Sequence, residues 1–189
     1  MDKTAEHEVS AAIVNRKGVA KSSDYTVAFS VDQSPDDVFT AINNVRGWWS
    51  ENIEGSTDEL DGEFVFHNEP WHVAKIRVVE LVPGKRVVWR VLENYMNFVN
   101  DTREWIGNEM VFDIARKVDT TEVVFTQVGL VPAYECYDAC SDAWGGYIKG
   151  SLRSLIATGT GARTEGLVIG ASVRQRDPSP LGGLASYKH

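Results

Sequence analysis

Three stretches in the second half of the chain decide the fold, and they read EWIGNEMVFDI (residues 104–114), TEVVFTQVGLVP (121–132) and WGGYIKGSLRSL (144–155). The first two contain apolar residues at alternate positions, over residues 110–114 and 123–127, which is typical of strands with one buried face. Asp119-Thr120 marks the turn between them. We therefore predict a β-hairpin.

The third stretch belongs to an amphipathic segment that predicts one long helix over residues 133–158. Its charged residues fall on one side, and its apolar residues recur every three or four positions. The apolar residues are Tyr137, Cys140, Trp144, Ile148 and Leu155. A helix of this kind buries one face against a sheet.

The segments upstream predict a first strand, a short helix and a strand meander. Residues 25–31 alternate like a strand, and residues 51–127 read as a meander with a strand over residues 86–91. The least regular part, residues 93–102, is a candidate loop over a cavity mouth.

A short helix is expected to follow the first strand. Ser34 is a favoured N-cap and Pro35 a favoured first helical residue. We expect Gly47 to end this helix and Trp48-Trp49 to follow in a turn or a second short helix.

In order and spacing, these segments resemble the activator-of-heat-shock-protein-ATPase homologue-like family of the START-like (SRPBCC, birch-pollen-allergen-like) superfamily. The resemblance covers residues 24–159. It also rests on Tyr25-x-Val27-x-Phe29-x-Val31, Ser34-Pro35-Asp36-Asp37-Val38-Phe39, Gly47-Trp48-Trp49 and Ile53-Glu54-Gly55. It implies an α+β helix-grip fold, in which a curved antiparallel sheet wraps around a long C-terminal helix and encloses an apolar cavity. It implies a container and no particular reaction.

The length of 189 residues predicts one domain with tails. We expect a flexible N-terminal arm over residues 1–22 and the START-like domain over residues 23–159. Gly, Ser, Pro and Arg dominate residues 160–189, which predicts a disordered C-terminal tail.

Charge and hydropathy narrow the classes of partner. The net charge of −8 argues against nucleic acid, and the absence of a run of 18 apolar residues argues against a membrane span. The polar start lacks a secretory signal, and two Cys suit a reduced compartment, so we predict a cytoplasmic monomer or weak homodimer.

Aromatic side chains are abundant, with six Trp and seven Phe, and such rings either fill a core or line a pocket. The residues predicted to bind a ligand are Trp49, Phe64, Phe66, Trp71, Trp89, Trp105, Met110, Phe112, Phe125, Gln127, Tyr137, Cys140 and Trp144. The alternative for any one of these rings is a solid core.

The polar residue in this set is Gln127, on the same strand face as Phe125. A buried amide needs a partner, which is a ligand, Tyr137 or a water molecule. Many relatives in the family that this chain resembles carry His at this position, so Gln removes a candidate general base.

Glycines in the middle of the long helix need an explanation, because each lowers the stability of the helix by about 1 kcal/mol relative to Ala. They are Gly145, Gly146 and Gly150. Either their missing side chains leave room for a ligand or a close approach to the sheet, or they serve tight packing alone.

No motif for catalysis, a metal or a cofactor is found. Cys136 and Cys140 lack the further ligands of a zinc site and are interpreted as buried small hydrophobes. His67 and His72 flank a predicted turn with Glu69, as solvated hairpin residues or as an acid–base site at the cavity rim. We therefore expect no catalytic residue, metal or cofactor.

The sequence thus favours non-enzymatic binding of a small hydrophobic or amphipathic molecule between sheet and helix. One alternative is a protein-interaction module with a chaperone partner and a role in the stress response, as the family resemblance implies. Another is a cyclase-type or hydrolase-type enzyme, a kind that the superfamily also contains.

Overall fold

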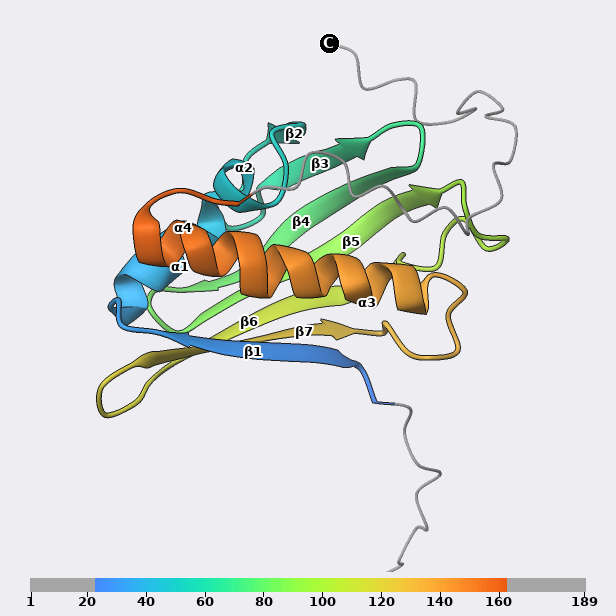
Figure 1. The fold of residues 1–189 in the computed structure, drawn as a ribbon. Helices are drawn as coiled ribbons and strands as arrows, with labels where there is room; N and C mark the ends of the chain where they lie inside the picture. The colour runs from blue at the N-terminus through green and yellow to red at the C-terminus, as the bar shows by residue number, and fades with distance from the viewer. Residues whose placement is uncertain (1–22, 163–189) are drawn as a thin grey trace, which may run out of the picture.

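The computed structural model describes residues 23–162 as an α+β fold, in which a curved antiparallel sheet packs against a C-terminal helix (Figure 1). The predicted arm (1–22) and residues 163–189 of the predicted tail lie outside the described residues. Within the described part, no helix has both the length and the apolar character needed to cross a membrane.

The sheet has seven strands in the order β1-β7-β6-β5-β4-β3-β2, and every neighbouring pair is antiparallel. The first strand therefore pairs with the last. The strands are β1 (Tyr25–Val31), β2 (Ile53–Gly55), β3 (Glu63–Asn68), β4 (His72–Val82), β5 (Arg86–Met96), β6 (Glu109–Arg116) and β7 (Thr121–Val128).

Strand β5 is longer than predicted, because residues 93–96 continue it and only the segment after Met96 is a loop. Asn94 pairs with Ala74 of β4 in the ladder, and its side chain is buried. The asparagines suggested a loop, but hydrogen bonding to a neighbouring strand overrides this weak local preference.

Two short helices link β1 to β2: α1 (Pro35–Asn43) and α2 (Val45–Trp48). The predicted cap is confirmed, since Ser34 Oγ accepts the Asp37 N–H at 3.2 Å and Asp37 Oδ2 accepts the Ser34 N–H at 3.2 Å. The prediction that Gly47 ends α1 is wrong. Asn44 leaves the helical conformation there, and Gly47 lies inside α2.

The C-terminal helix runs for 22 residues as α3 (Tyr137–Gly145), η1 (Gly146–Leu152) and α4 (Arg153–Thr158). It crosses the sheet diagonally (Figure 1). The predicted end is confirmed, but the helix starts at Tyr137 rather than at residue 133, because residues 132–136 form turns.

Segment η1 is a π-helix, and the spacing of buried residues explains it. The side chains facing the sheet recur every fourth residue: Cys140, Trp144, Ile148, Leu152 and Ile156. In an α-helix each step of four overshoots one turn by about 40°, so such a row would wind around the helix. The wider π-turns, with i→i+5 hydrogen bonds, reduce this drift and keep the row on the core.

The opposite face of the sheet carries cross-strand ion pairs. Lys75 Nζ lies 2.7 Å from Glu63 Oε2, and Arg77 also contacts this carboxylate. Arg86 bridges Glu80 and Asp113 in the same way. This face therefore carries charged pairs beside a small buried apolar pair, Val88 and Val111, and the main core lies on the side of the helix.

Candidate functional site

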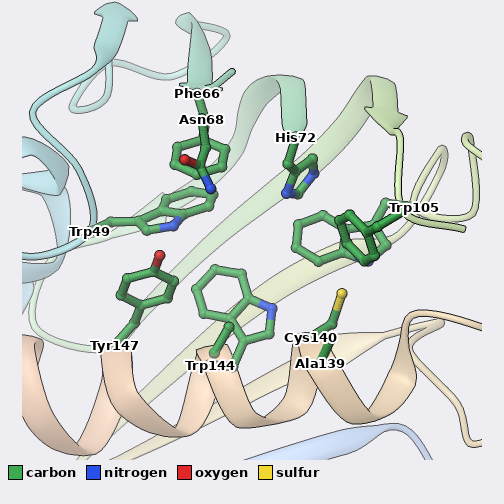
Figure 2. A pocket seen from close by; sticks show the side chains of 11 residues that line it. Trp49, Phe66, Asn68, His72, Trp105, Ala139, Cys140, Trp144 and Tyr147 are labelled. Atoms are coloured by element: carbon green, nitrogen blue, oxygen red, sulfur yellow. The ribbon is translucent and has the colours of Figure 1, made fainter. Parts of the chain in front are cut away.

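A partly open cavity of about 50 Å³ lies between α3, the start of η1 and the β3–β4 side of the sheet. Most of its wall is aromatic, and Figure 2 shows rings from the sheet and from the helix facing one another. It is lined by Trp49, Phe66, Asn68, His72, Phe98, Trp105, Ala139, Cys140, Ala143, Trp144 and Tyr147.

Small residues on the helix leave this space open. Ala139 and Ala143 lie one turn apart on α3 and line the cavity, and alanine has no atom beyond Cβ to fill it. Two of the helix glycines do not leave room for a ligand. Gly146 and Gly150 are exposed, and a Cβ added at either would meet no atom within 4 Å.

The loop after β5 closes one side of the cavity and is tied to the helix. Both oxygens of Glu104 accept N–H groups at the start of α3, from Glu135 at 2.6 Å and from Cys136 at 3.0 Å. Cys136 provides no side-chain cap of its own. Glu104 thus caps the helix from another segment and holds the neighbouring Trp105 against the cavity.

His72 is a buried titratable group of the site, along with Tyr147, whose pKa is raised by burial. His72 Nε2 lies 2.8 Å from Asn94 Oδ1, while Asn94 Nδ2 donates to the Thr102 carbonyl at 3.1 Å. Burial lowers the pKa of His72 to about 4, although the hydrogen bond to Asn94 opposes the shift. The imidazole is therefore neutral at neutral pH.

The two thiols are buried, as expected for small hydrophobic residues. The hydrogen bond with Cys140, together with burial, raises the pKa of Cys136 well above its usual range. Cys136 is therefore a thiol, not a nucleophilic thiolate. Among residues 23–162, no cluster of His, Cys, Asp or Glu could hold a metal ion.

Several residues predicted to bind a ligand do line the cavity: Trp49, Phe66, Trp105, Cys140 and Trp144. Trp71 and Tyr137 are half-buried and lie outside the lining. The others fill the adjacent core with little or no exposure, and these are Phe64, Trp89, Met110, Phe112, Phe125 and Gln127. Binding by any of these residues stays a prediction.

The core next to the cavity is solid because its rings contact one another. Phe112 lies 4.9 Å from both Trp89 and Phe125, measured between ring centroids, and Phe125 lies 4.6 Å from Trp144. Trp144 thus occupies the space under β6 and β7 in which a ligand was expected. The cavity is displaced towards β3 and β4.

Gln127 is fully buried and binds a side chain that the sequence analysis did not consider. The Trp144 indole Nε1 donates to Gln127 Oε1 at 2.5 Å. The amide therefore positions a ring of the cavity wall and does not reach the cavity itself.

The lining residues absent from the predicted set are Asn68, Phe98, Ala139, Ala143 and Tyr147. His72 was placed at the cavity rim only as an alternative to a solvated hairpin residue, and it does line the cavity. For His72 a signal was present. His72, Ala74, Ile76 and Val78 occupy alternate positions on the core face, and Val73 between the first two is buried as well, so the strand begins at the histidine rather than after it. The expectation of a solvated hairpin residue is wrong at His72.

Comparisons with known proteins identify the fold through structures alone. No family model matches the chain, and no curated protein does. The solution structure of the Aha1 dimer from Colwellia psychrerythraea matches with a TM-score of 0.60 at 20% identity, over 74% of this chain and 99% of that chain.

Two further solved structures have the same architecture. MLL2253 from Mesorhizobium loti matches with a TM-score of 0.54 at 13% identity, over 69% of this chain and 95% of that chain. DynU16, from the dynemicin biosynthetic locus, matches with a TM-score of 0.53 at 14% identity, over 74% of this chain and 49% of that one. The resemblance seen in the sequence is thus confirmed at the level of the fold: the chain has an Aha1-like fold of the START-like (SRPBCC) type.

Proposed function

We propose that the protein binds the apolar end of a small amphipathic molecule in the cavity beside α3. The observation that carries this proposal is the cavity itself. Rings fill the rest of the core, yet Ala139 and Ala143 leave a space of about 50 Å³ between aromatic walls. Pockets lined by aromatic side chains with a few polar groups are typical small-molecule sites.

The size of the cavity narrows the kind of ligand. A closed apolar cavity of about 150 Å³ accepts benzene, and this one measures about 50 Å³. A ring or chain end therefore enters only in part, and the rest of the molecule lies outside the cavity. This favours an amphipathic ligand over a fully enclosed apolar one.

The proposal is tested by filling the cavity. Ala143→Leu places a larger side chain in the lining, while Gly146→Leu adds the same side chain on the exposed side of the same helix. We expect wild type and Gly146→Leu to bind 1-anilinonaphthalene-8-sulfonate with micromolar affinity, roughly −8 kcal/mol. Ala143→Leu should bind at least about tenfold more weakly, which corresponds to about 1.4 kcal/mol.

Probe fluorescence and quenching of Trp emission measure this binding. Equal affinities of the two leucine variants would contradict a site in this cavity. Native mass spectrometry of freshly purified protein is the complementary measurement, because a co-purified small molecule that is absent from Ala143→Leu would identify the natural ligand.

A protein-interaction module is a second candidate, and the match to the whole Aha1 chain favours it. That structure is a dimer and is covered over 99% of its length by this fold. If the protein acts as such a module, it should raise the turnover of a heat-shock-protein ATPase, and Ala143→Leu should leave that effect intact. Enzyme chemistry has less support, because the cavity lining contains no carboxylate and its His72 is a weak base.

A further inference from the structure

The orientation of the Asn94 amide is fixed by its second partner. Asn94 Nδ2 lies 3.1 Å from the carbonyl oxygen of Thr102. A carbonyl oxygen only accepts hydrogen bonds, so the amide nitrogen must face Thr102 and the amide oxygen must face His72. An exchange of the two amide atoms would place two oxygens against each other.

This orientation determines where His72 carries its proton. Asn94 Oδ1 accepts only, and it lies 2.8 Å from His72 Nε2, so Nε2 is the protonated nitrogen. In a neutral imidazole the other nitrogen, Nδ1, then presents a lone pair. Within residues 23–162, Nδ1 has no hydrogen-bond partner.

The imidazole forms part of the cavity wall. Its ring meets Trp105 edge to face at 4.6 Å and Phe66 at 5.4 Å, measured between ring centroids. Figure 2 shows it pointing from β4 towards the helix, between the rings of Trp49 and Trp105. Nδ1 is not fully enclosed by the protein, so its lone pair is open to a donor that enters the cavity.

We infer that Nδ1 of His72 accepts a hydrogen bond from a hydroxyl or N–H group at the inserted end of the ligand. The inference rests on the proposed function and specifies the chemical class of the ligand. The site selects a neutral molecule whose apolar or aromatic end carries a donor, such as a phenol, an alcohol or an indole. At Nδ1 itself a carboxylate is disfavoured, because it would meet the lone pair without a proton between them; within the described residues, an unpaired donor of the lining is Trp105 Nε1, on the neighbouring ring.

The first test measures the tautomer in the full-length protein without ligand. The ¹⁵N chemical shifts of the His72 ring distinguish a protonated nitrogen from a bare one. We expect a protonated Nε2 and a bare Nδ1 at pH 7. A protonated Nδ1 or a doubly protonated ring would overturn the inference, whatever the protein binds.

The second test compares 4-fluorophenol with 4-fluorotoluene, which differ by a hydroxyl in place of a methyl group, by ¹⁹F NMR titration. His72→Phe keeps an aromatic ring and removes the acceptor. We expect the ratio of the two affinities to shift against the phenol by about five- to tenfold in this variant, as expected for one hydrogen bond.

The outcomes separate the inference from the proposed function. If both probes bind wild type and their affinity ratio is the same in His72→Phe, the cavity is a binding site but His72 does not recognise a donor. If neither probe binds wild type, both proposals fail. A phenol preference that His72→Phe removes, together with a bare Nδ1, supports the inference.

Discussion

At the scale of single residues, burial of His72 links stability to pH. Its pKa is about 4 in the folded protein and about 6.5 in an unfolded chain, so the unfolded state binds the proton more tightly. The His72 contribution is fully present above pH 6.5 and is lost as the pH falls from 6.5 to 4.

We predict that wild type loses about 3 kcal/mol of unfolding free energy between pH 6.5 and 4 through this residue. His72→Gln should lack this part of the decline. Urea unfolding of both proteins across the pH range measures the difference. If the unfolding free energies of the two proteins changed in parallel with pH, protonation of His72 in the folded protein would carry no cost in free energy.

The contact between Gln127 and Trp144 is the second feature at this scale. A double-mutant cycle with Gln127→Leu and Trp144→Phe should give a coupling energy of about 1 kcal/mol or more, because either single change leaves one buried polar group without its partner. Additive effects in urea unfolding would mean that the short contact contributes no net stability.

A change in probe binding is expected from Trp144→Phe, since Trp144 lines the cavity.

At the scale of elements, the start of the C-terminal helix depends on a loop. Glu104 accepts the N–H groups of Glu135 and Cys136 through its two carboxylate oxygens. We predict that Glu104→Ala lowers the unfolding free energy by about 1–2 kcal/mol, the usual range for loss of a cap.

Hydrogen exchange provides the local measurement. Amides at the start of α3 should exchange faster in Glu104→Ala, while those of α4 at the other end of the helix serve as the internal control. Uniform changes along the helix would point to global destabilisation instead. Probe binding should weaken as well, because Trp105 follows Glu104 directly and forms part of the wall.

The sequence suggested that the helix glycines are needed for steric reasons, so that a larger residue would do harm. At Gly150 the structure leads us to predict the opposite, a gain in stability. Gly150 faces solvent, and an added Cβ meets nothing within 4 Å. Gly150→Ala should therefore raise stability by up to about 1 kcal/mol. Gly161→Ala is the contrasting variant and should lower it, because a Cβ there would collide with the backbone carbonyl oxygen of Gly47. Thermal unfolding distinguishes the two signs.

At the scale of the whole molecule, the domain boundary is a further prediction. Thr160 O accepts a hydrogen bond from Ser154 at 2.8 Å, and a Cβ at Gly161 would lie 2.1 Å from the Gly47 carbonyl oxygen. The chain thus stays packed on the body up to this point. Removal of residues 163–189 should leave the thermal midpoint nearly unchanged, because their composition resembles that of a disordered segment. Removal from residue 160 onwards should lower the midpoint.

The architecture was predictable because periodicity and caps are local signals. The alternation around Phe112 and Phe125 and the cap at Ser34 each specify one element, and the family resemblance supplied their arrangement. The cavity was less predictable. Whether Phe112 lines a space or fills one depends on which side chains from distant segments stand opposite it, here Trp48, Trp89 and Phe125, and local periodicity does not specify such contacts. The partner of Gln127 was missed for the same reason.

The pairing of the first strand with the last has a consequence for synthesis on the ribosome. Tyr25 lies opposite Gln127, so β1 has no partner until about 100 further residues have been made. At roughly 5–20 residues per second, this wait lasts on the order of 5–20 s. Throughout it the nascent chain presents an unpaired, partly apolar edge, the kind of surface that chaperones cover. Closure of the sheet therefore comes late in the synthesis of this protein.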